Sequence, residues 1–258
     1  MNPWRLSANA FRTILTKEIL RFSRIWIQTV LPPMVTTALY FVIFGQLIGS
    51  RLGEMGGHPY IDFIVPGLIL MSVISNSYAN VVSSFYNAKF QRHVEELLIS
   101  PVPNAVILGG YVAGGVARGI VVGTAVTIVA SLFTDFAVHN FVVTFAVLLL
   151  TSTLFATAGF VNAVFANSFD DISVVPTFVL TPLTYLGGVF YSVSLLPEIW
   201  QRLSFANPVL YMINAFRFGL LGVSDIDLRL AFGLILAFIV ALGGFALWLL
   251  HRGIGLKS

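Results

Sequence analysis

The chain has 258 residues, of which 57% are hydrophobic and only 10% are charged, and its mean hydropathy is +0.92. A soluble domain carries about 25% charged residues and needs a polar surface around its core. The composition therefore excludes a soluble enzyme and a soluble nucleic-acid-binding domain, and it predicts an integral membrane protein. The sequence has no cysteine, which excludes disulfides, thiolate chemistry and cysteine-ligated metals.

The first predicted element is an amphipathic helix over residues 3–26. At 100° per residue its large apolar side chains fall on one side, and most of its basic side chains fall elsewhere. Such a helix lies in the headgroup plane of a membrane. Pro32 and Pro33 follow at the start of the first apolar stretch, where a turn out of that plane is needed. A simple basic anchor is the alternative interpretation. The apolar side comprises Trp4, Phe11, Ile14, Leu15, Phe22, Ile25 and Trp26.

Six stretches are long and apolar enough to cross a bilayer, which takes about 20 residues. Arg118 is the only Asp, Glu, Lys or Arg within them. We therefore predict an all-α polytopic membrane protein, with a separate segment over residues 1–26 and a six-helix membrane domain over 27–258. The predicted spans are residues 27–48, 63–85, 105–133, 141–166, 172–191 and 230–250.

The distribution of Lys and Arg predicts the orientation of the chain. Five of these residues lie in the N-terminal segment, two follow the second span and two lie near the C-terminus, against four on the opposite side. Both termini are therefore predicted to be cytoplasmic.

A charged insert, residues 87–102, separates the second and third spans. Arg92, Glu95 and Glu96 have the spacing of i,i+3 and i,i+4 pairs on a helix, and Pro101 and Pro103 end it. A short charged helix held between two spans suits docking to a cytoplasmic partner. A solvated connector is the alternative.

The second span carries polar residues over about half of its circumference. Uncharged polar groups are costly against lipid, so this side should face protein or water. A translocation pathway and simple helix–helix hydrogen bonding explain it equally well. The fifth span adds a similar set, and Pro176 and Pro182 predict an interrupted, movable helix there. The candidate pathway residues are Ser72, Ser75, Asn76, Asn80, Thr177, Thr181, Thr184 and Tyr185.

The third span contains two glycine series with four-residue spacing, which favours close helix packing. They are Gly110/Gly114 and Gly115/Gly119/Gly123. Arg118 lies among them, and a buried arginine needs a partner or a wet cavity. A structural pair or a side chain that reaches the cytoplasmic surface is favoured over contact with an anionic substrate.

Residues 192–229 are too polar to cross a membrane and too apolar for a free loop. Broken helices that dip back into the outer leaflet fit this mixture, provided that irregular backbone there is buried in protein or lines water.

Catalytic and metal-binding motifs are absent from the sequence, and so is a Walker motif for ATP. No catalytic or metal-ligating residue is predicted, and the chain is not expected to be an enzyme. The spans also contain no Asp or Glu, which proton-coupled carriers commonly need. If the protein transports a substrate, its energy is expected to come from another subunit.

Three motifs resemble those of the ABC-2-type transport permeases, the membrane subunits of ATP-binding cassette transporters. The most specific is GGVFYSVSLLPEIWQRLSFANP at 187–208, followed by Arg217. The others are EELLISP at 95–101 and FDDI at 169–172. The resemblance covers essentially the whole chain and includes the YadH-like bacterial inner-membrane permeases, which share stretches such as VPTFVLTPLTYLGGVFYS and FIVPGL.

The resemblance implies a type V ABC exporter-like fold: six helices per subunit, a homodimer around a central path, and two copies of a cytoplasmic ATPase. ATP and Mg²⁺ would then be bound by the ATPase and no cofactor by this chain. It implies an interface helix at the N-terminus with Arg12, Lys17, Glu18 and Arg21, and re-entrant helices within 192–222. It further implies a coupling helix at about 87–101, which includes Lys89, Phe90, Arg92, Glu95, Glu96 and Leu97. The re-entrant signature residues are Pro197, Asn207, Pro208 and Arg217.

The sequence thus predicts an exporter permease in a bacterial inner membrane, with membrane lipid, the ATPase and a second copy of itself as partners and no nucleic acid. The alternative is a non-transporting scaffold or sensor subunit of an ATPase complex. The motifs do not discriminate among drugs, lipids and glycans as substrates.

Overall fold

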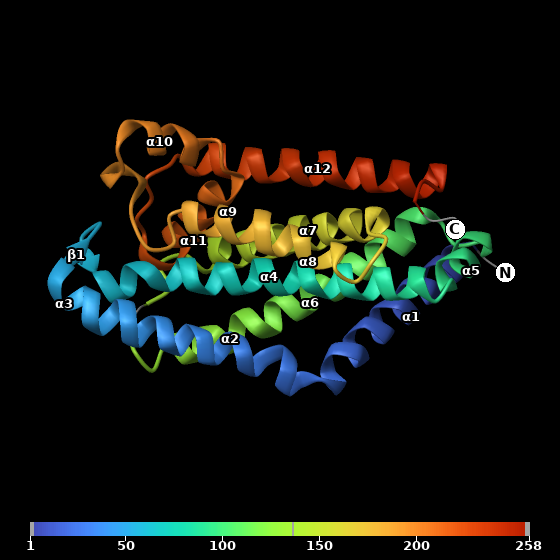
Figure 1. Cartoon of the computed structure of the whole chain (residues 1–258), viewed down its shortest axis with the longest axis horizontal. Coiled ribbons are helices and arrows are strands. Elements are labelled where there is room, and N and C mark those ends of the chain that lie inside the picture. The colour runs from blue at the N-terminus through green and yellow to red at the C-terminus, as the bar shows by residue number, and fades with distance from the viewer. Residues whose placement is uncertain (1–2, 136, 256–258) are drawn as a thin grey trace.

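The computed structural model describes residues 3–135 and 137–255 as a bundle of long helices that run side by side (Figure 1). α1 (Pro3–Arg24) crosses the bundle obliquely, and α2 (Trp26–Tyr40) runs along it. The chain bends between them at Ile25, whose backbone leaves the helical region. Pro32 and Pro33 lie inside α2 instead, so the turn comes before the proline pair and not at it. Proline inside a membrane helix is tolerated because neighbouring groups satisfy the freed carbonyls.

The first apolar helix continues past α2 through a π-helical stretch, Phe41–Ile48, and the short α3 (Gly49–Leu52). A two-residue turn then joins β1 (Glu54–Met55) to β2 (His58–Pro59) in an antiparallel hairpin. The turn residues Gly56 and Gly57 have φ values of 61° and 78°. Both lie in the left-handed region that this tight turn requires and that glycine adopts without strain.

α4 (Tyr60–Phe90) forms the centre of the bundle and is buried over most of its length. It packs against α6 (Asn104–Ala130), α7 (Phe141–Phe165) and α11 (Pro208–Leu221). Glycines make these contacts close. A β-carbon on Gly159 of α7 would lie 2.6 Å from the Tyr78 carbonyl oxygen of α4. The core of the protein therefore surrounds the second predicted span.

The two glycine series of α6 face three neighbouring helices. Gly110 and Gly114 face Ile14 and Glu18 of α1. Gly115 faces Val81 of α4 and Ala156 of α7. The predicted role of these glycines in close packing is confirmed, and it includes contact with α1, which the sequence pattern did not assign to a partner.

The next helical segment is interrupted. α8 (Asp171–Val175), a π-helical stretch (Pro176–Leu180) and α9 (Thr181–Leu186) follow one another without a break in direction (Figure 1). Pro176 begins the π-helical stretch and Pro182 lies in the first turn of α9, so the regular α-helical pattern is interrupted at the prolines, and movement of this helix stays a prediction. The helix ends at Leu186, not at residue 191 as predicted, because Gly187 and the left-handed Gly188 turn the chain.

The remaining elements lie toward the C-terminus. A 3₁₀ turn (Val193–Leu195) and α10 (Glu198–Phe205) precede α11, and α12 (Leu228–Arg252) runs back along the bundle. α10, α3 and the hairpin lie at one end of the bundle. α5 (His93–Ile99) lies at the other end, with both ends of the described chain (Figure 1).

Among the described residues, five helical segments are long and apolar enough to cross a membrane: 26–52, 60–90, 104–130, 141–165 and 228–252. They match the first four predicted spans and the last. The segment Asp171–Leu186 is apolar but shorter. At 1.5 Å per residue its 16 positions extend about 24 Å, less than a hydrocarbon core of about 30 Å. The chain is therefore a helical multi-pass membrane protein, and a crossing by this sixth helix stays a prediction.

Candidate functional site

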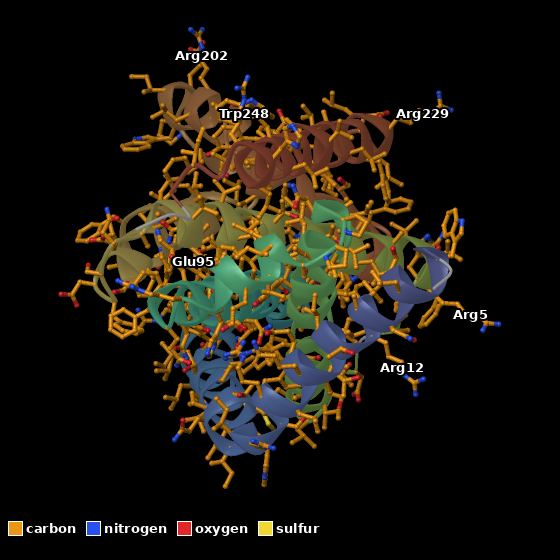
Figure 2. The ribbon with its side chains drawn as sticks, turned by 90° about the vertical axis from the view of Figure 1, so that its right-hand side faces the viewer. Arg5, Arg12, Glu95, Arg202, Arg229 and Trp248 are labelled. Atoms are coloured by element: carbon orange, nitrogen blue, oxygen red, sulfur yellow. The ribbon has the colours of Figure 1, made fainter. Side chains whose placement is uncertain are left out.

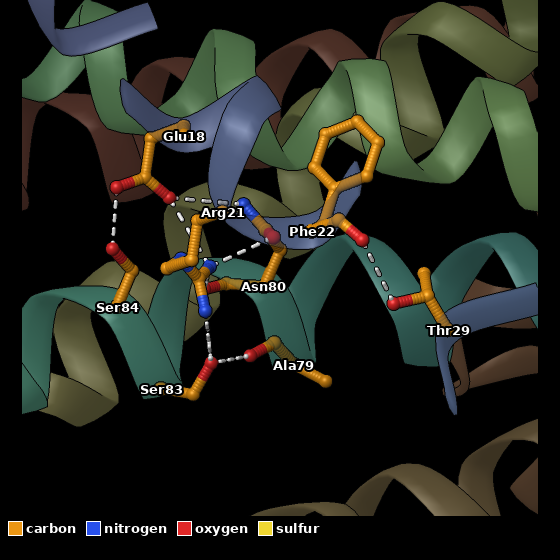
Figure 3. Close-up of polar contacts among 8 residues, drawn as sticks. All are labelled: Glu18, Arg21, Phe22, Thr29, Ala79, Asn80, Ser83 and Ser84. Carbon is orange, nitrogen blue, oxygen red and sulfur yellow. Dashed lines mark hydrogen bonds and ion pairs between the residues drawn. The ribbon is translucent and has the colours of Figure 1, made fainter. Parts of the chain in front are cut away.

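A buried polar cluster joins α1 to α4 (Figure 3). The Glu18 side chain is fully buried, and its carboxyl group accepts hydrogen bonds from the Ser84 hydroxyl and, at 3.3 Å, from the Asn80 amide nitrogen. The Arg21 guanidinium lies 3.2 Å from the same carboxyl group. A buried carboxyl with several partners avoids the large cost of an unpaired buried charge.

Arg21 extends the cluster along α4. Its Nη2 atom donates to both the backbone oxygen and the side-chain oxygen of Asn80, each at 2.8 Å, and its Nη1 atom lies 3.4 Å from the Ser83 hydroxyl. Two of the four predicted interface-helix residues, Glu18 and Arg21, are therefore anchors within the chain. The other two, Arg12 and Lys17, are exposed, and Arg12 points away from the bundle (Figure 2).

The predicted coupling segment is divided between two helices. Lys89 and Phe90 form the last turn of α4, and only 93–99 make the separate helix α5. The helix therefore begins six residues later than the predicted 87. Arg92, at the junction, has φ 61°, a left-handed conformation that is uncommon for a residue with a β-carbon and ends the longer helix before the shorter one starts.

Lys89 is directed into the protein. Its ammonium group donates to the carbonyl oxygens of Val164 at 2.7 Å and Ala166 at 2.8 Å, at the C-terminal end of α7. These carbonyls have no partner within their own helix, and a cation is favourable at a helix C-terminus. Lys89 thus fixes the end of α4 to the end of α7.

The outer surface of α5 is both charged and apolar. Arg92 and Glu96 are exposed, while Glu95 and Leu97 are half-buried. Ile99 is 85% exposed, and the exposed ring of Phe90 contacts Phe169 in the loop before α8. α5 itself lies at the end of the bundle that carries both ends of the described chain (Figure 1).

The FDDI stretch forms a reciprocal helix cap. The Asp171 backbone N–H donates to the Ser168 hydroxyl, and the Ser168 backbone N–H donates to the Asp171 carboxylate, both at 3.1 Å. The pattern satisfies two N–H groups that a helix start leaves unpaired. It holds Phe169 at the tip of the loop, next to Phe90.

The polar residues of the second span divide into buried and exposed sets. Ser72, Asn76 and Asn80 are buried within the chain, and Ser75 is exposed. Asn76 accepts from the Arg118 guanidinium at 3.1 Å and donates to the Ser72 carbonyl oxygen. Hydrogen bonding between helices therefore accounts for Asn76 and Asn80, and Arg118 has a structural partner in the neighbouring helix.

The candidate residues of the interrupted helix lie mostly on the surface. Thr177, Thr181 and Tyr185 are exposed, whereas Thr184 is buried. The hydroxyl groups of Tyr185 and Tyr40 lie 2.7 Å apart, so α9 contacts α2 directly. Tyr40 could not be identified from the sequence, because the two tyrosines are remote along the chain.

The predicted re-entrant signature residues lie near the end of the bundle that carries α10 and make contacts between its helices. Pro197 precedes α10, and Asn207 and Pro208 form the cap and first turn of α11. The Asn207 side chain accepts from the Val209 backbone N–H and donates to the Leu183 carbonyl oxygen.

Arg217 of α11 is almost fully buried. Its guanidinium lies 3.9 Å from the centre of the Phe63 ring and donates to the Gly188 carbonyl oxygen. An arginine over an aromatic face in a dry environment is held by a cation–π interaction. Arg217 therefore ties α11 to the start of α4 and to the turn after α9.

Comparisons with known proteins agree with this architecture. Residues 9–221 match the family model described as "ABC-2 type transporter". The chain is 59% identical over 249 residues to "Inner membrane transport permease YadH" of Escherichia coli strain K12, which covers 96% of this chain and 97% of that protein. It is 26% identical over 219 residues to "Nodulation protein J" of Sinorhizobium fredii, covering 84% and 81%. These matches extend over most of the chain, and the chain belongs to the ABC-2 type transporter family.

Proposed function

We propose that this chain is the membrane subunit of an ATP-driven exporter, works as a homodimer, and is driven by two copies of a separate ATPase on the cytoplasmic side. The observation that carries the proposal is the similarity to an inner membrane transport permease along almost the whole chain. In this proposal, both termini are cytoplasmic, ATP and Mg²⁺ are bound by the ATPase, and no cofactor is bound by this chain.

The contact with the ATPase would use α5 and the loop beside it. Ile99, Phe90 and Phe169 present exposed apolar side chains there, next to the exposed Arg92 and Glu96. Apolar anchors surrounded by charged groups are typical of protein interfaces. Since α5 follows α4 after a two-residue turn, a force on α5 would reach the central helix directly.

The cluster of Glu18, Arg21 and Asn80 provides a second connection. It fixes α1 to α4 through hydrogen bonds in a buried site, where such bonds are strong and costly to break. A displacement of α1 by the ATPase would therefore move α4 with it. The two cytoplasmic elements would then act on the same helix.

The substrate pathway would run along the exposed side of α2, α4 and the interrupted helix. Ser75, Thr177, Thr181 and Tyr185 are the candidate residues that remain accessible in the single chain. The π-helical stretch between Pro176 and Leu180 gives that helix a bend point, because π-helical insertions interrupt the regular α-helical ladder. Re-entrant helices α10 and α11 would close the outer end.

Replacement of Glu95 and Glu96 by alanine tests the coupling role. The E95A/E96A variant, co-expressed with the cognate ATPase, should associate with it more weakly and lose transport-coupled ATP turnover. The matched control is Glu198→Ala on α10, which removes an exposed acidic residue at the opposite end of the bundle. Association is measured by co-purification of the ATPase with this chain. Transport is measured in proteoliposomes as ATP-dependent movement of a compound that co-purifies with the complex and is identified by mass spectrometry.

Unchanged association and turnover in E95A/E96A would overturn the coupling assignment. ATPase assembly without any vectorial movement of a compound would instead favour a scaffold or sensor subunit. Transport by the purified chain without an ATPase would favour a carrier that supplies its own energy.

A further inference from the structure

We propose that the bend between α1 and α2 holds the headgroup of an anionic phospholipid. The structure has a groove at this bend, lined by Lys17, Leu20, Arg21, Arg24 and Ile25. The proposal requires a membrane protein but no ATPase and no transport activity, so it stands apart from the proposed function.

The charge of the groove is unbalanced. Glu18 is the only acidic residue between positions 3 and 52, and it is buried with Arg21. Lys17 and Arg24 are exposed, and Lys17 lies over the Tyr111 ring with its ammonium 5.9 Å from the ring centre. Lys17 and Arg24 are therefore available to an anion in the groove, whereas Arg21 is already paired with Glu18.

The groove also presents apolar surface. The side chains of Leu20 and Ile25 are 51% and 41% exposed. A free inorganic anion would gain nothing from these two side chains. The glycerol and the first methylenes of a phospholipid would cover them and bury apolar area.

The position of the groove fits the edge of a membrane. Trp26, the first residue of the apolar helix, is 61% exposed, and tryptophan is enriched at the level of lipid headgroups. The excess of basic residues predicts that this level belongs to the cytoplasmic leaflet, whose anionic lipids attract such residues.

The location favours lipid over the ATPase as the occupant. The bend lies on the flank of the bundle, whereas α5 and both ends of the described chain lie at its end (Figure 1). A protein seated on α5 would approach from that end, and the flank is where the bilayer surrounds a membrane bundle.

The test compares two charge-removing pairs on the same helix. K17Q/R24Q removes the accessible cations of the groove. R5Q/R12Q removes two exposed cations that point away from the bundle (Figure 2) and is the matched control. Each full-length protein is purified from detergent, mixed with equimolar phosphatidylglycerol and phosphatidylcholine, and its retained lipids are counted by native mass spectrometry.

We expect wild-type protein to retain phosphatidylglycerol in preference to phosphatidylcholine. Each basic side chain near an anionic surface contributes about fivefold in affinity, so K17Q/R24Q should lose about 25-fold. R5Q/R12Q should lose much less affinity than K17Q/R24Q, since its two side chains lie outside the groove. K17R/R24K, which keeps both charges, should bind like wild type. Thermal unfolding of all variants shows whether the fold is retained.

Any of four results would overturn the proposal. Equal losses of phosphatidylglycerol in K17Q/R24Q and R5Q/R12Q would mean that the whole helix attracts anionic lipid without a specific site. Unchanged retention in a folded K17Q/R24Q would mean that the groove is not the site. Displacement of phosphatidylglycerol by millimolar inorganic phosphate would identify a free phosphate site and not a lipid site. Loss of ATPase association in K17Q/R24Q, with lipid retention unchanged, would identify the groove as a protein contact.

Discussion

Asn80 connects the two charged residues of α1 to the central helix. Its amide nitrogen donates to Glu18, and its two oxygens accept from Arg21. Loss of the Asn80 side chain would leave a buried carboxyl group and a half-buried guanidinium with fewer partners. Glu18 and Arg21 would remain paired with each other, but each would lose a hydrogen bond to the Asn80 side chain in a buried site, which is costly.

We therefore expect Asn80→Leu to lower the free energy of unfolding by about 1–3 kcal/mol. Ser75→Leu on the same helix, at an exposed position, should leave stability unchanged and impair transport if the exposed side of α4 lines the pathway. Thermal and denaturant unfolding in detergent measure the first effect, and proteoliposome transport measures the second. A stable N80L protein would show that the cluster contributes little to the contact between α1 and α4.

The apolar pattern of the sequence predicts the long helices well, because period and length are local properties. Five of the six predicted spans coincide within a few residues with long helices. The sequence predicts a turn near Pro32 and Pro33, whereas the chain turns at Ile25, because both prolines are tolerated inside α2. The early end at Leu186 depends on Gly188, whose positive φ is decided by packing and not by composition.

The candidate site was less predictable than the helices. The sequence shows that Asn80 is polar, but its partners Glu18 and Arg21 come from α1. The residues around Asn80 in the sequence do not indicate which helix packs against it. The resemblance to the ABC-2-type permeases includes Lys89 in the coupling helix. The contact of Lys89 with the carbonyls of α7 depends on two helix ends meeting in space, which a single sequence does not encode visibly.

Helix packing around α4 gives a prediction at the level of elements. A β-carbon at Gly159 would lie 2.6 Å from the backbone oxygen of Tyr78, and backbone cannot move aside as a flexible side chain can. Gly159→Ala should lower the free energy of unfolding by about 1–3 kcal/mol through overpacking. At Gly243 of α12, an added methyl group would have no atom of the described residues within 4 Å. Gly243→Ala should therefore be neutral or stabilising by up to about 1 kcal/mol.

Unfolding in detergent, measured for both alanine variants against wild type, checks this contrast. A G159A protein as stable as wild type would mean that α4 and α7 can separate at no cost. A destabilised G243A protein would mean that the exposed side of α12 packs against another chain, since lipid alone would accept the added methyl group.

At the scale of the whole molecule, the orientation of the chain decides which surfaces can meet an ATPase. The start of α1, α5 and the end of α12 lie at one end of the bundle, and α10 lies at the other (Figure 1). Arg5 and Arg252 are exposed at the first end, and Glu198 is exposed at the second. The rule that Lys and Arg accumulate on the cytoplasmic side predicts that the first end is inside the cell.

The absence of cysteine from the sequence makes this orientation directly measurable, because a single introduced thiol has no background. In intact spheroplasts, a membrane-impermeant maleimide should label Glu198→Cys and leave Arg5→Cys and Arg252→Cys unlabelled. After permeabilisation all three should react, which controls for accessibility. Labelling of Arg5→Cys and Arg252→Cys in intact spheroplasts would show that the protein has the opposite orientation. It would place α5 out of reach of ATP, whereas the expected pattern puts α5 and the lipid groove on the side where ATP is available.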